Sequence, residues 1–470
     1  MVVLMRVLFA TSEVVPYSKT GGLADVAGAL PRALAAQGHE LLVVSPWYRS
    51  LRAEPAPLWI GDVDAPFAGG FEPVGVGTLE ADGVRYAFVG HRDFQREDLY
   101  GYSDDVRRFS RFTRAVPQVA ARLGFLPDLV HANDWHTGYL PLVLAHGWHL
   151  PAGFPGLPSI FTVHNVQYQG TSGLEEALWW LRLPGAFAQE YMNHFGSANA
   201  MQAALGYTWA VTTVSPTYAA EIQRPEYGYG LDGTFRHVRD KLVGILNGLD
   251  TEAWNPGGDT YLPRPYDADD PGGKTEAKRA LTQRLELDGS TPVLGVVSRL
   301  ADQKGIDLLE AAGDRLVRQG WSVALLGSGD ALLERALRDL AARHPGRVGA
   351  VIGFDEALAH LIYAGSDALA VPSRFEPCGL SQMIAMRYGT VPIARDTGGL
   401  HDTVEHQQTG YLFEHANPEG LLWATGLAME AYGSDRWAAM MRRAMRRDFS
   451  WERSAQRYAE LYEGVVASAR

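Results

Sequence analysis

Three stretches near the N-terminus decide the fold class: Met5-Arg-Val-Leu-Phe-Ala10, the run Leu-Ala-Asp-Val-Ala-Gly-Ala-Leu-Pro-Arg-Ala-Leu at residues 23–34, and Glu40-Leu-Leu-Val-Val-Ser45. The outer two are short apolar runs typical of buried strands, and the middle one, continuing to residue 37, has a helical pattern. This order predicts a βαβ unit with parallel strands. Lys19-Thr-Gly21-Gly22-Leu lies between strand and helix, where free N–H groups can bind phosphate; the alternative is a plain glycine turn with a surface lysine.

The same alternation continues along the chain. Further strand-like runs occupy residues 128–131, 159–163 and 210–214, and a second set begins at residue 293 and continues at 322, 348, 368 and 390. They predict an α/β protein with two doubly wound units. Residues 62–89 predict a hairpin inserted in the first domain, and residues 249–289, rich in Pro, Asp and Gly, predict a linker. Residues 437–467 predict one long helix that either completes the second domain or returns to the first.

Composition narrows the function classes. The chain has 470 residues, which predicts two or three domains, and a net charge of -12, which argues against a nucleic-acid partner. Cys378 is the single cysteine, so an intramolecular disulfide and a Cys-based zinc site are excluded. No apolar run approaches the roughly 18 residues of a membrane span, and the N-terminus lacks a basic leader, so we expect a cytoplasmic protein without a membrane partner.

Polar motifs follow the predicted strands of the first domain. They are His131-Ala-Asn-Asp134-Trp-His136 and Phe161-Thr-Val-His164-Asn165. The C-terminal ends of parallel strands meet at one edge of a sheet, where ligands bind. Asp134, His136 and His164 are therefore candidates for binding sugar hydroxyls or for acid–base work. The alternatives are a helix cap by Asp134 and buried, hydrogen-bonded histidines. A metal site is not expected, because the histidines lack a matching group of carboxylates.

Three motifs carry the chemistry of the second domain. The first is Ser298-Arg299-Leu-Ala-Asp-Gln-Lys304-Gly, in which an arginine fork and a lysine can clamp a diphosphate in place of a divalent ion. The second, Glu376-Pro-Cys378-Gly379-Leu380-Ser381, offers a carboxylate to sugar hydroxyls and N–H groups at a helix start. The third, Thr397-Gly398-Gly399-Leu, repeats the glycine pair of the first domain. The alternatives are solvated cations, an ordinary salt-bridging glutamate and a plain turn.

Several familiar motifs are absent from the sequence. There is no P-loop, no Gly-x-Gly-x-x-Gly after the first strand and no Gly-x-Ser-x-Gly elbow. Asp62-Val-Asp64 and Asp267-Ala-Asp269 have the spacing of the metal-binding Asp-x-Asp of some glycosyltransferases. Both lie in the predicted insertion or linker, so we interpret them as coincidental.

In their order along the chain, these motifs resemble bacterial glycogen synthase and plant starch synthase from end to end. Further shared landmarks are Thr213-Val-Ser-Pro-Thr-Tyr and Ile245-Leu-Asn247-Gly-Leu-Asp. The resemblance implies the GT-B fold, with two Rossmann-like domains facing a deep interdomain cleft. It implies an N-terminal acceptor-side domain at residues 1–245, a nucleotide-sugar-binding domain at 246–450, and a terminal helix at 451–470 that crosses back to the N-terminal domain.

The resemblance also implies a reaction. Family members transfer glucose from ADP-glucose to the nonreducing 4-OH of an α-1,4-glucan, retain the α configuration, and need no metal or cofactor. The donor ADP-glucose and a glycogen acceptor are therefore the expected partners. Position 384 is isoleucine, where related retaining families have a second glutamate, and this speaks against a general glycan transferase.

Residue roles follow from the resemblance position by position. Arg299 and Lys304 are expected to hold the donor diphosphate, Glu376 the glucose hydroxyls, and His164 the 6-OH beside the anomeric carbon. Phe354 stands where the family often has tyrosine and keeps a ring that can stack on adenine. The remaining residues expected to bind substrate are Lys19, Gly21, Gly22, Asp25, Tyr100, Asp134, His136, Asn165, Asn247, Cys378, Gly379, Leu380, Ser381, Thr397, Gly398 and Gly399.

Three rival interpretations remain at the level of sequence. One is another GT-B transferase that uses UDP-glucose or a different acceptor. The second is a glucan phosphorylase, which would carry pyridoxal phosphate on a lysine. The third is an inactive glucan-binding protein, which is disfavoured because every expected charged site residue is present. The oligomeric state cannot be read from the sequence.

Overall fold

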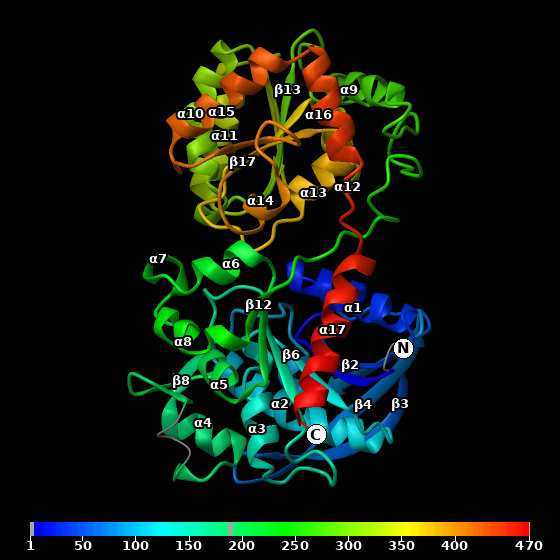
Figure 1. Cartoon of the computed structure of the whole chain (residues 1–470), viewed down its shortest axis with the longest axis vertical. Helices are drawn as coiled ribbons and strands as arrows, with labels where there is room; N and C mark the ends of the chain where they lie inside the picture. The colour runs from blue at the N-terminus through cyan, green and yellow to red at the C-terminus, as the bar shows by residue number, and fades with distance from the viewer. Residues whose placement is uncertain (1–3, 187–190, 470) are drawn as a thin grey trace. The chain divides into compact units, whose positions relative to one another are not determined.

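The computed structural model describes residues 4–186 and 191–469 and divides the chain into two compact units (Figure 1). The first comprises Met1–Gly248 together with Trp451–Arg470, and the second comprises Leu249–Ser450. Each unit is a doubly wound α/β structure, so the predicted fold class is confirmed. Among the described residues, no helix is long and apolar enough to cross a membrane.

The first unit is built on a mixed sheet. Its nine described strands are β1 (Arg6–Ala10), β2 (Glu40–Pro46), β3 (Leu58–Phe67), β4 (Gly70–Ala81), β5 (Val84–Gly90), β6 (Leu129–Asn133), β7 (Ser159–Val163), β11 (Ala210–Thr213) and β12 (Leu242–Gly244). They lie in the order β12-β11-β7-β6-β1-β2-β5-β4-β3. All neighbours are parallel except β5–β4 and β4–β3, which are antiparallel.

The hairpin predicted at residues 62–89 is confirmed as antiparallel pairing of β3 with β4 and of β4 with β5, but it is not an insertion. This segment belongs to the main sheet, because β5 pairs in parallel with β2 and then carries β4 and β3 as an antiparallel edge. The alternating pattern of β5 explains the difference. Val84, Tyr86 and Phe88 are buried in the core shared with β1 and β2, so this strand is held by long-range packing and not only by its hairpin neighbour.

The remaining elements of the first unit surround this sheet. The helices are α1 (Gly22–Ala36), α2 (Asp105–Arg122), α3 (Leu140–His146), α4 (Leu174–Leu181), α5 (Ala200–Tyr207), α6 (Pro216–Glu221), α7 (Pro225–Gly228), α8 (Asp232–His237) and α17 (Trp451–Ala469). A small antiparallel sheet contains β8 (Thr171–Gly173), β9 (Asn193–His194) and β10 (Ser197–Asn199). Short 3-10 turns occur at Arg92–Phe94, Trp135–Thr137 and Arg239–Lys241.

The second unit has a fully parallel sheet. Its six described strands are β13 (Val293–Val297), β14 (Ser322–Gly327), β15 (Val348–Ile352), β16 (Ala368–Val371), β17 (Val391–Arg395) and β18 (Tyr411–Phe413), in the order β15-β14-β13-β16-β17-β18. The order reverses between β13 and β16, and in the first unit the corresponding reversal lies between β1 and β6. In open α/β sheets ligands bind beyond the strand ends at such a reversal.

The helices of the second unit are α9 (Gly272–Arg284), α10 (Ile306–Arg318), α11 (Ala331–Arg343), α12 (Glu356–Gly365), α13 (Ser381–Arg387), α14 (Gly398–Thr403), α15 (Pro418–Ala431) and α16 (Asp435–Met445), with a 3-10 turn at Asp302–Lys304. The predicted linker at residues 249–289 is only partly a linker. It contains α9, which packs against α12 and buries Ala277 and Leu281. Its low apolar content concealed a short helix with a narrow buried face.

The predicted single helix at residues 437–467 is also wrong, because the chain forms α16 and α17 with a break between them. At the break the Ser450 N–H bonds to the Asp448 carboxylate, and Phe449 O accepts the N–H of Leu249 at 2.6 Å. α16 buries Trp437 and Met440 in the second unit, whereas α17 packs beside α1 in the first (Figure 1). The first half of this stretch therefore completes the second unit, and the second half returns to the first unit.

Candidate active site

The clearest candidate site in the second unit is a small cavity at the ends of β13 and β16. Its volume is about 130 Å³, and Arg299, Lys304 and Glu376 are among its lining residues. Lys304 Nζ lies 2.6 Å from Glu376 Oε2, and the Ser373 hydroxyl donates to the same oxygen at 2.8 Å. The Glu376 side chain is buried. A buried carboxylate is tolerated when it is paired and hydrogen-bonded, and Lys304 and Ser373 supply both interactions to Glu376.

The two loops that carry Lys304 and Glu376 are tied together. Arg374 forms a two-pronged ion pair with Asp307, with both N–O distances at 2.7 Å, and its main-chain N–H donates to Gln303 O at 2.8 Å. Gly305 has a φ of +63°, and a Cβ there would lie 2.0 Å from Pro372 O. The loops are therefore in direct backbone contact, and only glycine fits at that point.

Two expected donor-binding residues are exposed at strand ends of the same sheet. Arg299 follows β13, and among the described residues its side chain has neither a hydrogen bond nor an ion pair. Phe354 follows β15 and is 90% exposed. An unpaired guanidinium and a free aromatic face are both able to receive a ligand, the first a phosphate and the second a base.

The glycine pair of the second unit packs against the loop of Glu376. Gly399 N–H donates to Glu376 O at 3.0 Å, and a Cβ at Gly399 would lie 2.1 Å from Cys378 O. Gly379 has a φ of +75°. The Gly399 N–H is thus already engaged, so this glycine positions the Glu376 loop. Leu380 and Ser381, at the start of α13, line the cavity, and their binding of substrate stays a prediction. Thr397 immediately precedes α14, and Gly398 is its first residue.

In the first unit, Asp134 and His164 meet at the ends of β6 and β7. Asp134 Oδ1 accepts the main-chain N–H of His164 at 2.7 Å and that of Asn165 at 3.4 Å. Asp134 has a φ of +53°, an uncommon backbone conformation for a residue with a side chain. Burial raises the pKa of Asp134 to about 7. This carboxyl therefore changes charge near neutral pH.

The proton on His164 can be assigned from its neighbours. Asn133 Nδ2 donates to Ala10 O at 3.1 Å, which directs Asn133 Oδ1 toward His164 Nε2 at 3.0 Å. An amide oxygen only accepts, so Nε2 carries the hydrogen and Nδ1 is the acceptor. Burial lowers the pKa of His164 to about 3, so the ring is neutral at physiological pH. His164 is suited to hydrogen bonding and not to supplying positive charge.

Aromatic rings gather beside this pair. Tyr100 stacks on His136 with ring centres 4.5 Å apart, and His136 in turn stacks on Trp135 at 4.1 Å. The Tyr100 hydroxyl hydrogen-bonds to Ser12 Oγ at 2.8 Å. Among residues 4–186 and 191–469, Nδ1 of the buried His136 has no hydrogen-bond partner. Tyr100 and His136, predicted separately, therefore form one cluster.

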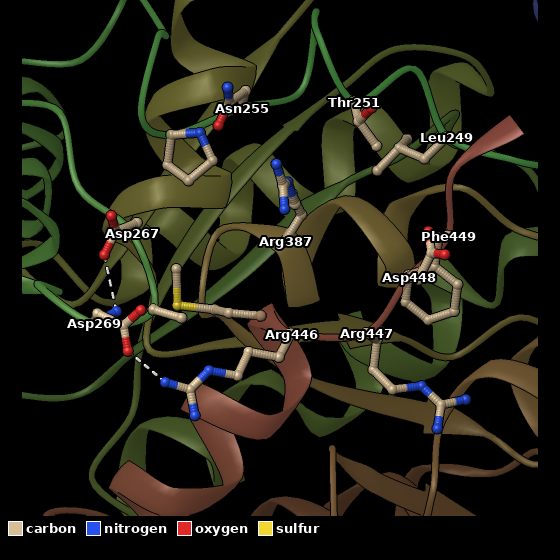
Figure 2. A pocket seen from close by; sticks show the side chains of 13 residues that line it. Leu249, Thr251, Asn255, Asp267, Asp269, Arg387, Arg446, Arg447, Asp448 and Phe449 are labelled. Atoms are coloured by element: carbon tan, nitrogen blue, oxygen red, sulfur yellow. Dashed lines mark hydrogen bonds and ion pairs between the residues drawn. The ribbon is translucent and has the colours of Figure 1, made fainter. Parts of the chain in front are cut away.

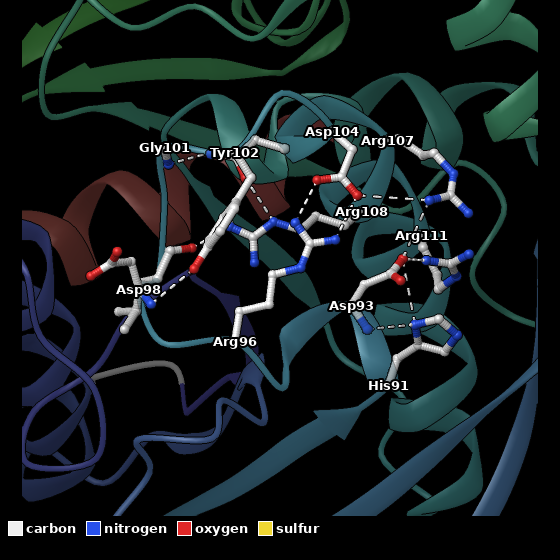
Figure 3. A network of polar contacts seen from close by, with 12 residues as sticks. His91, Asp93, Arg96, Asp98, Gly101, Tyr102, Asp104, Arg107, Arg108 and Arg111 are labelled. Carbon is white, nitrogen blue, oxygen red and sulfur yellow. Dashed lines mark hydrogen bonds and ion pairs between the residues drawn. The ribbon is translucent and has the colours of Figure 1, made fainter.

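A polar network supports the segment that carries Tyr100 (Figure 3). The buried Arg108 donates to Leu99 O and pairs with Asp105 at 2.7 Å, and Asp105 also accepts the Gly101 N–H at 2.8 Å. Arg111, three residues further along α2, pairs with the buried Asp93. Sequence reasoning missed this network, because arginines on a helix are usually solvated and their spacing gave no sign of burial.

The Lys19 loop brings together two residues expected to bind substrate, Lys19 and Asp25, and that role stays a prediction. Lys19 Nζ pairs with Asp25 at 2.7 Å, and both side chains are largely open to solvent. Behind the loop, the buried Glu13 accepts the Thr20 N–H at 2.5 Å and the Thr20 hydroxyl at 2.7 Å. Burial raises the pKa of Glu13, although these hydrogen bonds oppose the shift. Glu13 was missed by the sequence analysis, since a lone glutamate in a loop carries no motif.

The other predicted residues of the first unit lie at the start of α1 and in the segment after β12. Gly21 precedes α1, and a Cβ at Gly22 would meet open space, so the backbone there is accessible. Asn247 is buried, and within the described chain its Oδ1 has no hydrogen-bond partner. His131 is structural: it bonds to Tyr462 at 2.7 Å and to Thr162 at 2.6 Å.

Neither Asp-x-Asp stretch lines the candidate cavity of the second unit. Asp62 and Asp64 lie on the edge strand β3, and Asp267 accepts the N–H groups of Asp269 and Asp270 at 2.8 Å. Within the described residues there is no group of three or more His, Cys, Asp or Glu side chains that could hold a metal ion.

Comparison with known proteins agrees with this geometry. Residues 6–237 match the starch synthase catalytic domain family, and residues 277–444 match the family of group 1 glycosyl transferases. The chain is 49% identical to the glycogen synthase of Deinococcus deserti, over 98% of this chain and 100% of that protein. It is 40% identical to the glycogen synthase of Geobacillus stearothermophilus, over 98% of each.

Solved structures give the same result. The catalytic domain of starch synthase IV from Arabidopsis thaliana, bound to ADP and acarbose, superposes with a TM-score of 0.90 at 34% identity and covers 99% of this chain and 100% of its own. Sucrose-phosphate synthase from Thermosynechococcus elongatus superposes with a TM-score of 0.62 at 18% identity, over 98% of this chain and 99% of its own. The second likeness shows the fold alone.

Proposed function

The chain belongs to the glycogen synthase and starch synthase family of GT-B glycosyltransferases, and from that premise we propose that it transfers glucose from ADP-glucose to the nonreducing 4-OH of an α-1,4-glucan. The observation that carries the proposal is the Lys304–Glu376 pair in the cavity at the strand reversal of the second unit. A cation suited to phosphate and a carboxylate suited to sugar hydroxyls are therefore close enough to contact the same sugar nucleotide.

We propose that the donor lies across the strand ends of the second unit. Arg299 and Lys304 bind the diphosphate and stabilise the negative charge that develops as it leaves. Phe354 stacks on the adenine, and its full exposure supports this role. Glu376 binds the glucose hydroxyls through the oxygen that Lys304 and Ser373 leave free. No metal ion is needed, because the two cations supply the positive charge.

In the proposed reaction, the bond between glucose C1 and the diphosphate oxygen breaks, and a bond from C1 to the acceptor O4 forms on the same face. The hydroxyl proton passes to the departing diphosphate oxygen, so ADP leaves with the proton and the α configuration is retained. The neutral His164 accepts a hydrogen bond from the 6-OH through Nδ1, and Asp134 binds a sugar hydroxyl. Glu376 binds and does not attack. A glucosyl adduct trapped on Glu376 would contradict this mechanism.

One assay tests the function directly. Glycogen elongation is measured with ADP-glucose and with UDP-glucose, each in the presence of EDTA. We expect ADP-glucose to be the better donor and EDTA to have no effect on the rate. Transfer only from UDP-glucose, or a strict metal requirement, would refute the assignment. A visible pyridoxal band would instead indicate a phosphorylase.

We also propose that the protein acts in the cytoplasm. The support comes from the sequence, whose single cysteine is typical of proteins from compartments in which thiols stay reduced. Cell fractionation followed by immunodetection tests this location, and recovery of the protein from the periplasm or culture medium would refute it.

A further inference from the structure

The second unit holds another cavity, larger than the candidate active site, with a volume of about 390 Å³ (Figure 2). Its walls come from residues 249–256, residues 267–269, the end of α13 and residues 445–449. None of the residues assigned above to donor or acceptor lines it. The volume lies in the range of small-molecule sites, roughly 300–1,000 Å³.

The acidic side chains of this cavity already have partners. Asp267 accepts two main-chain N–H groups at 2.8 Å, and Asp269 forms an ion pair with Arg446. Asp448 accepts the Ser450 N–H at 2.9 Å. Arg447, on the opposite side of the cavity, pairs with Glu405. Each of these charged side chains is therefore engaged in a contact within the protein.

Arg387 differs from these other charged side chains that line the cavity. It is the last residue of α13, and among residues 4–186 and 191–469 its side chain has no hydrogen bond and no ion pair. Its Nε is buried. Figure 2 shows the Arg387 side chain in the middle of the lining residues, between Asp267 and Asp269 on one side and Thr251 and Leu249 on the other. A buried donor without an acceptor is unfavourable, and a guanidinium pairs readily with phosphate oxygens.

We propose that this cavity binds a phosphorylated small molecule of sugar-phosphate size, with Arg387 holding the phosphate group. Thr251 and Asn255 line the same cavity and offer hydrogen bonds to the ligand's hydroxyls. A free phosphate ion alone would leave most of the volume unfilled. Leu249 and Phe449 both line the cavity and are joined by a main-chain hydrogen bond of 2.6 Å, so the ligand contacts both segments through which the chain enters and leaves this unit.

The test is a binding measurement on the full chain, independent of transferase activity. Ribose 5-phosphate is titrated calorimetrically into the R299A/K304A variant, whose donor site is disabled, with orthophosphate and ribose as comparison ligands. We expect saturable binding of ribose 5-phosphate, weaker binding of orthophosphate and none of ribose. Hydrogen exchange should slow in peptides covering residues 249–256 and 445–449 when ribose 5-phosphate is present.

Three further substitutions in that background locate the site. R387Q should weaken ribose 5-phosphate binding by about tenfold or more, because a charged hydrogen-bond donor to phosphate is lost. A268W should abolish binding by filling the cavity while leaving Arg387 in place, which keeps the test decisive even if R387Q does not fold. R442Q removes an exposed arginine of α16 outside the cavity and should change the affinity by less than about twofold.

Four results would overturn the proposal. They are the absence of saturable ribose 5-phosphate binding, equal binding in the R387Q variant, undiminished binding in the A268W variant, and orthophosphate or ribose binding as tightly as ribose 5-phosphate. Each is separable from the transferase proposal, since neither the ligand nor the variants report on glucose transfer.

Discussion

Lys304 and Glu376 lie 72 residues apart in the chain, and their charged atoms are 2.6 Å apart in space. Substituting Lys304 alone removes this ion pair. K304A leaves the buried Glu376 unpaired and removes a cation from the proposed diphosphate site. We expect kcat/KM for ADP-glucose to fall by on the order of 10²-fold or more. Steady-state kinetics with glycogen measures this.

Lys278 and Asp367 provide a matched control. Their ion pair, at 2.8 Å, is buried to a similar degree but lies outside the candidate cavity. K278A should therefore destabilise the protein to a comparable extent and leave kcat/KM near that of the unchanged chain. If K304A retained near-full activity, the assignment of the diphosphate site would be wrong.

Asp134 makes the stability of the protein depend on pH. Burial raises its pKa from 3.8 to about 7. Between these values the folded protein binds the proton more tightly than the unfolded chain, so the contribution of Asp134 to stability falls as pH rises from about 4 to 7 and is constant above. The asparagine in the D134N variant does not titrate, so that variant lacks this pH-dependent contribution to stability.

Urea unfolding at pH 5 and pH 8 tests the effect. Relative to D134N, the unchanged protein should be more stable at pH 5 than at pH 8 by about 1–3 kcal/mol, since one pKa unit corresponds to about 1.4 kcal/mol. A difference that is the same at both pH values, or that has the opposite sign, would show that Asp134 is ionised throughout.

At the scale of elements, α10 fixes the position of a loop that it does not contain. Asp307, in its first turn, holds Arg374 by two bonds of 2.7 Å and so joins the Lys304 turn to the Glu376 loop. D307N should lower kcat/KM by about tenfold. The link between the two loops is weakened, while the charges of Lys304 and Glu376 remain. D314N, on the same helix but paired with His344, should leave kinetics unchanged. An effect as large for D314N as for D307N would indicate general destabilisation of α10.

The sequence predicted these elements with uneven success. Strands β1, β2, β7 and β13–β17 were placed within a few residues, because their apolar runs are bounded by turn residues. The pairing of β5 with β2, helix α9 and the break between α16 and α17 were missed. In each case the decisive interaction comes from a distant part of the chain: β2 for β5, α12 for α9 and Leu249 for the break. Local periodicity contains no information on such partners.

At the scale of the whole molecule, the C-terminal helix completes the first unit. α17 buries Trp451, Tyr458, Tyr462, Val465 and Val466 in the same core as β1 and β2. Exposing these five side chains would cost about 10 kcal/mol at roughly 2 kcal/mol each, which is comparable with the entire stability of a domain. A chain truncated after Ser450 should therefore lose the cooperative unfolding of its first unit.

The second unit provides the internal control. It is continuous in sequence, Leu249–Ser450, and contains its own core. Expressed alone, it should unfold cooperatively in a calorimetric scan. If the truncated chain kept two transitions, the contribution of α17 to the first core would be smaller than its burial indicates.

The sequence by itself determined the α/β class, the two doubly wound units, the family, and the residue types at the candidate site. Short, contiguous stretches of sequence are sufficient to predict all of these features. The tertiary structure decided which of those residues meet: Lys304 with Glu376, Asp134 with His164, and Tyr100 with His136. It also revealed Glu13, Arg108 and Arg387, which belong to no motif. The physical reason is that burial and pairing of polar groups depend on chain segments brought together only by folding, whereas apolar periodicity and glycine turns act locally.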